Sequence, residues 1–436
     1  MNGRVGIMVL SLVGAVVLGA IGPVGASGAV GTPSWPQAGF DAGGSNFNPG
    51  ETTITTGNVE SLTEAWAARG RAFVSADGLL FTGGRKLSAY SITACAPAGG
   101  HCAPTWVSDA GFHGEVAVSG GVVYATGRDR AGHAGVAAFD AAGLDNCTRT
   151  NPTVCTPLWR WVDKADGSSV FSPKIGNGRL WVSDTVTQGF DTIAAHLRAF
   201  DISHACAVTC KPVRSITTPT TGSTFTLGAQ QVVLAPEAGS VAVYDARTGA
   251  VQWRSRTHGP RSTVVAQGGT IYASNQKTLE VEAYPDDGGA SCSGAPKVCS
   301  PAFVVPYSAN NPPTLAATPS LLFVDDTVDI RTYDAAGVAH CFGARHVCQP
   351  ITTYPGAGGT DAPVVAGNVL YSATSRAINA YDATASAGCD QATRTCTELW
   401  RMTPEPSAPS SIEVAGGLVY TTSENDAFIH VFAPTG

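Results

Sequence analysis

The stretch that decides the fold is VAVYDARTGAVQW, residues 241–253. An apolar run ends at Tyr244 and Asp245, a short turn follows through Gly249, and a second run ends at Trp253. Asp and Gly are typical turn residues, because Asp accepts backbone N–H groups and Gly adopts positive φ. Runs of β-branched and aromatic residues bounded by such turns are typical of strands. The stretch therefore predicts two antiparallel strands joined by a short turn.

The first half of this stretch recurs eight times, as an aliphatic residue, any residue, a small or aliphatic residue and an aromatic one. The mean step is about 49 residues, and the aromatic residues are Tyr90, Phe139, Phe200, Tyr244, Tyr284, Tyr333, Tyr381 and Phe432. Before each copy lies another β-type run, which in most copies contains a tight turn such as Asp-Gly, Gly-Gly or Asn-Gly, the kind that joins hairpin strands. Four short strands repeated eight times predict an all-β, eight-bladed β-propeller of four-stranded blades over residues 60–436.

The twelve cysteines all fall into close pairs, which suggests disulfides rather than metal or redox sites. The pairs are Cys95/Cys102, Cys147/Cys155, Cys206/Cys210, Cys292/Cys299, Cys341/Cys348 and Cys389/Cys396. Four of these pairs end four residues before a bulky apolar side chain, so they flank the turn between the third and fourth strands. A zinc site would need ligands two to four residues apart, although His101, His204, His340 and His346 lie near the pairs. A redox site would need a CxxC-like pair or an exposed reactive thiol. We predict six structural disulfides within hairpins.

The N-terminus predicts export. Residues 1–29 contain one early charge, Arg4, then an apolar stretch and small residues that suit cleavage, as in a secretory signal peptide. The alternative is an uncleaved membrane anchor. Residues 30–59 form an N-terminal lead-in segment. We expect a secreted protein without a membrane span after cleavage, because paired cysteines are typical of oxidising compartments.

The two ends of the propeller region predict how the ring closes. The last repeat provides three strands, and residues 61–68 resemble a fourth strand that has no third strand before it. We therefore expect residues 61–68 to pair with residues 428–433 as a clasp, since unpaired strand edges are avoided.

Composition restricts the partners and the sites. The net charge is −7 and only 14% of the residues are charged, so a nucleic-acid partner is not expected. The aspartates that follow the recurring aromatic residue are expected to cap turns, and the recurring tryptophans to pack between blades. The stretch DDTVD, residues 325–329, is expected to be a solvated turn between the second and third strands. No metal site is predicted.

The repeat at residues 241–253 resembles that of the PQQ-binding-like β-propellers. Asp245, Thr248, Gly249 and Trp253 match the D-x-x-T-G-x-x-x-W part of that repeat, and the segment from Trp35 resembles the start of many such proteins. The resemblance extends over about residues 35 to 436. It is specific for the fold and weak for activity, because this family includes quinoprotein alcohol dehydrogenases and non-catalytic envelope scaffolds.

The resemblance also implies what a dehydrogenase of this family would require. Those enzymes bind PQQ against a disulfide between adjacent cysteines and hold calcium with carboxylate and amide ligands. This chain has no Cys-Cys dipeptide and is short for that group, so we expect no cofactor, PQQ included. The leading interpretation is a secreted, non-enzymatic binding or scaffolding propeller, monomeric, with an envelope or extracellular protein or glycan as partner. The alternatives are a PQQ-dependent oxidoreductase and a polysaccharide-acting hydrolase or lyase.

No catalytic residues are predicted, but a ligand site is expected at one mouth of the central channel. Propellers gather there the loops that lead into each innermost strand and the loops between second and third strands. In this chain the candidates on those loops are Arg71, His113, Glu115, Arg128, Asp129, Arg130, His133, Arg261 and Asp361.

Overall fold

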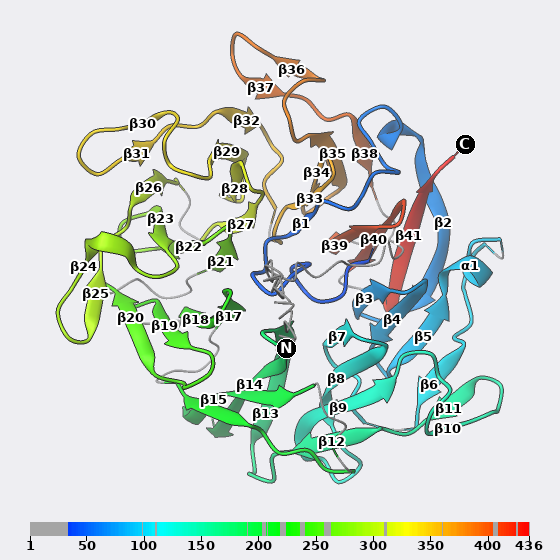
Figure 1. Cartoon of the computed structure of the whole chain (residues 1–436). Helices are drawn as coiled ribbons and strands as arrows, with labels where there is room; N and C mark the ends of the chain where they lie inside the picture. Colours follow the sequence, from blue (N-terminus) through cyan, green and yellow to red (C-terminus); the bar gives the residue numbers. More distant parts are fainter. Residues whose placement is uncertain are drawn as a thin grey trace, which may run out of the picture. The chain divides into compact units, whose positions relative to one another are not determined.

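The computed structural model describes residues 34–435 apart from 98, 110, 190, 203–205, 207, 219–223, 236–239, 257–262, 309–311, 360, 404–408 and 424–425. Eight antiparallel sheets are arranged around a central axis, as Figure 1 shows. The predicted all-β, eight-bladed propeller is confirmed. The signal peptide predicted for residues 1–29 lies outside the described residues.

The blades are numbered in the chain order of their innermost strands, and each has four antiparallel strands running outward. Blades 1 to 4 are formed by β3 (Ala72–Ala76), β4 (Leu79–Gly83), β5 (Ser88–Ser91), β6 (Trp106–Ser108); β7 (Val116–Ser119), β8 (Val122–Arg128), β9 (Ala134–Asp140), β12 (Trp159–Val162); β13 (Ser168–Gly176), β14 (Arg179–Gln188), β15 (Asp191–Asp201), β16 (Arg214–Thr217); and β17 (Thr224–Leu227), β18 (Gln231–Ala235), β19 (Ala242–Asp245), β20 (Val251–Ser255).

Blades 5 to 8 repeat this arrangement. They are formed by β21 (Val264–Gln267), β22 (Thr270–Asn275), β23 (Glu280–Pro285), β26 (Phe303–Pro306); β27 (Thr314–Ala317), β28 (Leu321–Asp325), β29 (Ile330–Asp334), β32 (Thr352–Tyr354); β33 (Val364–Ala366), β34 (Val369–Ala373), β35 (Ile378–Asp382), β38 (Trp400–Met402); and β39 (Pro409–Ala415), β40 (Leu418–Ser423), β41 (Phe428–Pro434), β2 (Leu62–Arg69). The helical elements are single turns: η1 (Val59–Ser61), α1 (Ile92–Cys95) and η2 (Gly289–Ser291).

Blade 8 closes the ring with strands from both ends of the described chain. Its outermost strand, β2, pairs antiparallel with β41 from Leu62 opposite Pro434 to Arg69 opposite Phe428. Trp66 of β2 lies opposite Val431, and both side chains are fully buried. The predicted clasp is confirmed.

The core is divided among the interfaces between blades. One hydrophobic cluster lies at each of the eight interfaces, and the aromatic residue that ends each third strand belongs to one of them. Five tryptophans that the sequence places on outermost strands are buried there, as expected: Trp66, Trp106, Trp159, Trp253 and Trp400. The turn aspartates also behave as expected; Asp245, for example, accepts the N–H groups of Arg247 and Thr248.

The six predicted disulfides are confirmed, and among the residues that the structure describes no cysteine is free. Each closes a loop between the third and fourth strands of its blade, which we call a latch. Four latches are small hairpins: β10 (Cys147–Thr148) with β11 (Thr153–Cys155), β24 (Cys292–Ser293) with β25 (Lys297–Cys299), β30 (Cys341–Phe342) with β31 (Val347–Cys348), and β36 (Cys389–Asp390) with β37 (Thr395–Cys396). They project from the periphery of the ring in Figure 1.

The other two latches are not hairpins in the part of the chain that the structure describes, so the predicted hairpin placement is wrong for them. In blade 1, Cys95 ends the helical turn α1 and is not in a strand opposite Cys102. In blade 3, Cys206 and Cys210 are four residues apart, and the described residues beside them form no strand pair with each other. Cys210 is 3% exposed in the hydrophobic cluster between blades 2 and 3, and its N–H donates to Arg160 O at 3.0 Å. The preceding blade therefore holds this disulfide loop in place of a hairpin partner.

Each latch extends the sheet of the preceding blade, which the sequence did not predict. Strands β11, β25, β31 and β37 pair in parallel with β6, β20, β26 and β32, the outermost strands of the blades before them. The latches of blades 1 and 3 do the same through parallel bridges from His101 to Ala67 and from Thr209 to Arg160. Six of the eight interfaces are therefore latched. The interfaces of blades 3 with 4 and 7 with 8 are not, since blade 4 has the short Asp245–Gly249 turn and blade 8 joins strands from two ends.

The lead-in segment follows the central channel and contacts every blade. We call residues 35–51 the belt; its strand β1 (Phe47–Asn48) pairs in parallel with β33, near the centre of Figure 1. Its contacts follow chain order from blade 1 to blade 8: Trp35 with Ser75, Pro36 with Val118, Gln37 with Ile175, Ala42 with Leu227, Gly43 with Ala266, Ser45 with Ala317, Asn46 with Val365 and Asn48 with Val414.

The belt needs close backbone approach at one of these contacts. A Cβ atom on Gly43 would lie 2.0 Å from the carbonyl oxygen of Ala266, so glycine is required where the belt passes blade 5. All eight contacts lie towards the C-terminal ends of the innermost strands. The belt therefore occupies the end of the channel opposite to the loops that lead into those strands.

Candidate functional site

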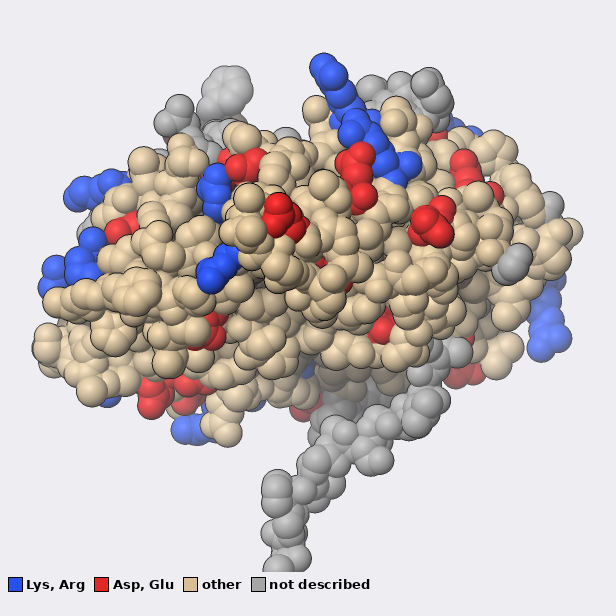
Figure 2. Space-filling view, turned by 90° about the horizontal axis from the view of Figure 1, so that it is seen from above, with Lys and Arg blue, Asp and Glu red and all other residues tan. Residues whose placement is uncertain are grey.

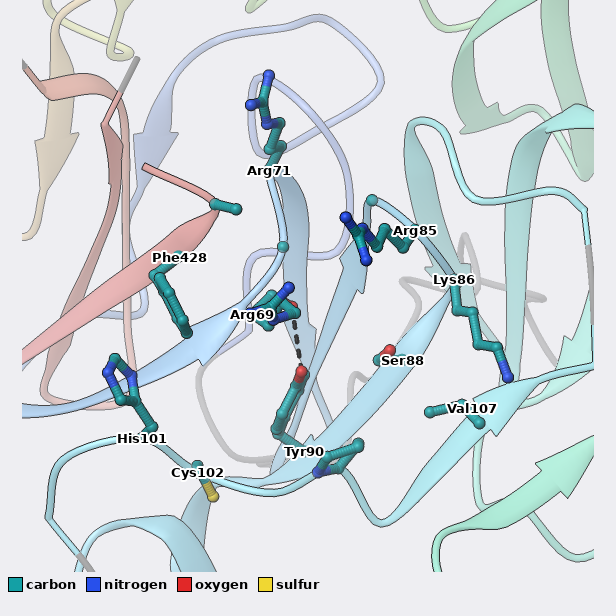
Figure 3. A pocket seen from close by; sticks show the side chains of 14 residues that line it. Arg69, Arg71, Arg85, Lys86, Ser88, Tyr90, His101, Cys102, Val107 and Phe428 are labelled. Carbon is teal, nitrogen blue, oxygen red and sulfur yellow. Dashed lines mark hydrogen bonds between the residues drawn. The ribbon is translucent and has the colours of Figure 1, made fainter. Parts of the chain in front are cut away.

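A large cavity lies between blades 8 and 1, on the loops that lead into the innermost strands. Its volume is about 830 Å³, within the range typical of small-molecule sites. It is lined by residues from four separate segments, shown in Figure 3: Arg69, Gly70, Arg71, Gly84, Arg85, Lys86, Ser88, Tyr90, His101, Cys102, Pro104, Val107, Ala427 and Phe428. We call it the 8/1 groove.

One wall of the 8/1 groove is a stack of three side chains. The rings of His101 and Phe428 lie with centroids 4.3 Å apart, and the guanidinium carbon of Arg69 is 5.3 Å from the Phe428 centroid. Figure 3 shows Phe428 between the other two side chains. A guanidinium over an aromatic face is attracted by the ring quadrupole. The stack therefore fixes the position of Arg69 before any ligand arrives.

The main chain of Arg69–Gly70–Arg71 is also held in place. The Gly70 N–H donates to Ala427 O at 2.9 Å, and the Arg71 N–H donates to Gly83 O at 2.8 Å. A Cβ atom on Gly70 would lie 2.4 Å from the Cβ of Thr82, so only glycine allows the segment to pass this close to blade 1. The arginines on either side of Gly70 are thus presented from a rigid segment.

Tyr90 forms part of the floor of the groove. Its hydroxyl donates to Arg69 O at 3.1 Å, which is the dashed line in Figure 3, and the Thr82 hydroxyl donates to the same oxygen at 2.9 Å. Burial raises the pKa of Tyr90 above its ordinary value, with smaller opposing effects from hydrogen bonds. The phenol is therefore a neutral structural group at neutral pH.

Four cationic side chains in the groove have no acidic partner among the residues described. Arg69, Arg71, Arg85 and Lys86 are all exposed, and none forms an ion pair within the described part of the chain. No Asp or Glu is among the residues that line the groove. Elsewhere, on the side that Figure 2 shows, acidic and basic side chains are interspersed. The groove is therefore a concentrated positive site on a chain of net charge −7.

The latch of blade 1 builds the outer wall. Disulfide Cys95–Cys102 closes this latch, the Cys102 N–H donates to Ala67 O at 2.8 Å, and the Ala67 N–H donates to Gly100 O at 2.7 Å. These bonds place His101 and Pro104 beside β2 of blade 8. The disulfide thus contributes to the shape of the groove as well as to stability.

Of the channel-mouth residues predicted from the sequence, only Arg71 lines this groove. The charged residues of the loop between β8 and β9 have partners within the protein. Arg128 donates to Ser168 O at 2.7 Å, Arg130 pairs with Asp109 at 2.9 Å, and Asp129 accepts the His133 N–H at 2.9 Å.

The other mouth candidates are spread around the ring. Glu115 accepts the N–H of Ser172 in blade 3, while the main-chain oxygens of His113 and Asp361 accept from Gly84 and Thr314. Arg261 lies outside the described residues. A ligand role for these residues stays a prediction.

The expectation of a solvated turn at residues 325–329 is wrong for its first two residues. Asp325 and Asp326 are each 1% exposed, because the loops at Ser308 and Gly359 cover them. Burial raises the pKa of Asp325 to about 7, against hydrogen bonds from the Gly359 and Thr327 N–H groups, and Asp326 and Asp361 add to the rise. Asp326 instead pairs with Arg331.

Comparison with known proteins places the fold. No family model matches the sequence and no curated protein matches it. Among solved structures, BamB from Moraxella catarrhalis aligns with a TM-score of 0.55 and 14% identity over 85% of this chain and 97% of that one. Quinohemoprotein alcohol dehydrogenase from Comamonas testosteroni aligns with a TM-score of 0.57 and 13% identity over 93% and 81%. This chain shares the β-propeller fold with these proteins.

A europium-containing methanol dehydrogenase is also similar, with a TM-score of 0.56, 11% identity and coverage of 92% of this chain and 98% of that one. At such identities the likeness concerns the fold alone. The resemblance implies a disulfide between adjacent cysteines for PQQ. The described disulfides do not fit that arrangement, since all six lie in latches and join cysteines four to eight residues apart.

Among the described residues, no helix is long and apolar enough to cross a membrane.

Proposed function

We propose that this chain is a secreted, non-enzymatic binding propeller whose ligand site is the 8/1 groove. The observation that carries the proposal is the groove itself: a cavity of about 830 Å³ in which Arg69, Arg71, Arg85 and Lys86 have no acidic partner among the described residues. A cleft lined by one sign of charge focuses the field and raises the local concentration of ligands of the opposite sign. The missing charge is supplied by a ligand.

The proposal of secretion rests on the disulfides. Six disulfides among twelve cysteines are typical of proteins exported to an oxidising compartment and are rare in the reducing cytosol. The apolar N-terminal sequence of residues 1–29 agrees with this and suits a cleaved signal.

Binding rather than catalysis suits the groups that line the groove. Glycoside hydrolysis ordinarily uses a pair of carboxylates, and the lining residues include none. Of the two other groups that could accept a proton, Tyr90 has a pKa raised by burial and a hydroxyl bonded to Arg69 O, and the ring of His101 packs on Phe428 without a carboxylate among the lining residues to orient it. Fixed cations and one aromatic stack orient and hold a ligand without removing a proton from it.

The test is capture of a partner from envelope and extracellular material of the producing cell. The full chain should retain a partner that a double variant, Arg69→Ser with Arg71→Ser, does not retain, while both proteins show the same far-UV circular dichroism and melting temperature. Equal capture by both proteins would contradict the groove as the binding site. Turnover of a retained glycan during incubation with the full chain would contradict the non-enzymatic assignment.

A further inference from the structure

The internal repeats provide a reference groove for the 8/1 groove. A second cavity, of about 630 Å³, is lined mainly by the corresponding segments of blades 4 and 5, together with Ala344 and Arg345 of the blade 6 latch. Aligned on the aromatic residue that ends the third strand, Tyr90 corresponds to Tyr284 and Ser88 to Glu282. Two residues after the second latch cysteine, Pro104 corresponds to Pro301. The two grooves therefore share one architecture and differ in their side chains.

The groove between blades 4 and 5 contains its own acidic groups. Glu282 lines it and accepts from Asn275 Nδ2 at 2.9 Å, and Arg345 on its wall pairs with Glu280 at 2.7 Å. Glu280 occupies the position of Lys86, and Glu282 that of Ser88. The propeller fold thus tolerates carboxylates at both positions. The positive charge of the 8/1 groove is a property of its sequence and not a requirement of the fold.

Three cationic side chains on other third strands have acidic partners. Arg198 pairs with Asp184 at 2.7 Å, Arg331 with Asp326 and Asp329, and His430 contacts Glu64 at 2.8 Å. Arg85 and Lys86, in the loop before β5, form no ion pair within the described part of the chain and lie in one groove with Arg69 and Arg71. Four cations in one groove therefore call for a ligand with more than one negative charge.

The walls between these cations are apolar. His101 and Pro104, which are exposed and half-buried, line the groove on the side of the latch, and the buried Tyr90 and Val107 lie beneath. A polyphosphate has no apolar surface to place against these walls, whereas the rings of a sugar chain have C–H faces as well as anionic substituents. Arginine binds such oxyanions through two parallel hydrogen bonds.

Resting on the proposal that the 8/1 groove is the binding site, we propose that its ligand is a short acidic oligosaccharide. Its carboxylate or sulfate groups contact Arg69, Arg71, Arg85 and Lys86, and its rings lie over His101 and Pro104. The ligand bridges blade 8, which carries both ends of the clasp, and blade 1. Binding therefore also stabilises the closed ring.

The chain offers a matched control for the test. Arg376 of blade 7 corresponds to Arg85 of blade 1, because each lies five residues before the aromatic residue that ends the third strand, Tyr381 or Tyr90. Both arginine side chains are exposed. Arg376 does not line the 8/1 groove. The variants Arg85→Glu and Arg376→Glu thus change the same residue type at the same point of the repeat, with the same change in net charge.

The experiment is isothermal titration calorimetry of the full chain with four probes: an oligogalacturonate, a heparin oligosaccharide, a neutral cello-oligosaccharide and a polyphosphate. One of the two acidic oligosaccharides should bind, which distinguishes carboxylate from sulfate, and the neutral one should not. Arg85→Glu should weaken binding at least about tenfold, on the order of one charged hydrogen bond, and Arg376→Glu by less than about twofold. Raising the salt from about 0.05 M to about 0.3 M should weaken binding of the full chain.

Each other outcome overturns one part of the proposal. Binding of polyphosphate alone, weakened by Arg85→Glu, would show that the groove takes anions but that the ligand is not a glycan. Binding of the neutral probe alone would show that charge does not select the ligand. Absence of binding by all four probes, with partner capture still lost in the Arg69→Ser/Arg71→Ser variant, would reject the oligosaccharide and retain the site. Capture unaffected by groove variants would reject the proposed function itself.

Discussion

Deletion of residues 427–436 should destabilise the whole propeller, because these residues include β41, the middle strand of the clasp. Ile429, Val431 and Phe432 on this strand are 0%, 0% and 3% exposed. Burial of each such side chain contributes about 1.5–3 kcal/mol, so the strand contributes roughly 5–9 kcal/mol. That is comparable with the entire stability of a typical domain, which is about 5–15 kcal/mol.

The assay is urea and thermal unfolding, followed by far-UV circular dichroism and tryptophan fluorescence. Trp66 lies on β2 opposite Val431 and is 1% exposed, so its emission should shift to longer wavelength when the clasp opens. The truncated chain should have little or no folded baseline at 25 °C. A melting temperature within a degree or two of the full chain would refute the clasp as the element that holds the ring.

Two point variants keep this prediction testable if the truncated chain does not fold. Phe432→Ala removes a buried ring from the clasp and should cost about 3–5 kcal/mol. Phe342→Ala removes a ring that is 63% exposed on the latch of blade 6, and should change stability by less than about 0.5 kcal/mol. Equal effects of the two variants would show that burial in the clasp does not determine stability.

Three further predictions concern the clasp, the latches and the cofactor. Burial alone would lower the pKa of His430, but hydrogen bonds to two carboxylates outweigh it and raise the pKa above its ordinary value. The charged imidazole therefore contributes its whole stabilisation below a pH of about 6.5, and this stabilisation is lost as the pH rises through the folded-state pKa. In urea titrations, His430→Gln should reduce the free energy of unfolding more at acidic pH than at alkaline pH. Replacing Cys95 and Cys102 by Ser should lower the free energy of unfolding by about 2.5 kcal/mol, and replacing Cys389 and Cys396 in the latch of blade 7 should lower it equally. Only the first change should weaken ligand binding in calorimetry, because only that latch lies at the 8/1 groove. Calorimetry with PQQ and calcium should give no binding at micromolar affinity, and tighter binding would revive the oxidoreductase alternative.

The ring itself could be read from the sequence because its signals are local and repeated. Each blade has a tight hairpin turn and a third strand that ends in an aromatic residue, and these spacings fix both the number of blades and the strand that must close blade 8. The disulfide pairing followed from the same local frame, since each cysteine pair flanks one turn. Local spacing determines the number of blades and the disulfide pairing, and the closing strand follows from counting the strands that the first and last repeats supply.

The sequence predicted that tryptophans pack between blades, but not which other segments meet at each interface. The latch at Cys147–Cys155 pairs with β6 of the previous blade, and nothing in its spacing specifies that parallel partner. The 8/1 groove combines Arg69, Arg85, His101 and Phe428 from four segments, of which the two farthest apart are more than 300 residues distant in the chain. Of the residues that line the groove, the sequence predicted only Arg71, because it lies on a loop that leads into an innermost strand and so could be placed without knowing its neighbours. The burial of Asp325 likewise depends on a loop of the next blade.

The belt has a consequence for how such a protein can evolve. Repeat proteins commonly gain or lose units by duplication, since each unit contacts only its neighbours. Here residues 35–51 contact all eight blades in chain order, and adjacent residues such as Trp35 and Pro36 contact successive blades. A duplicated blade would have no belt residue opposite it, and every later contact would be displaced by one position. The belt thus acts as a template that ties the number of repeats to its own length, so that a change in either must be matched by a change in the other.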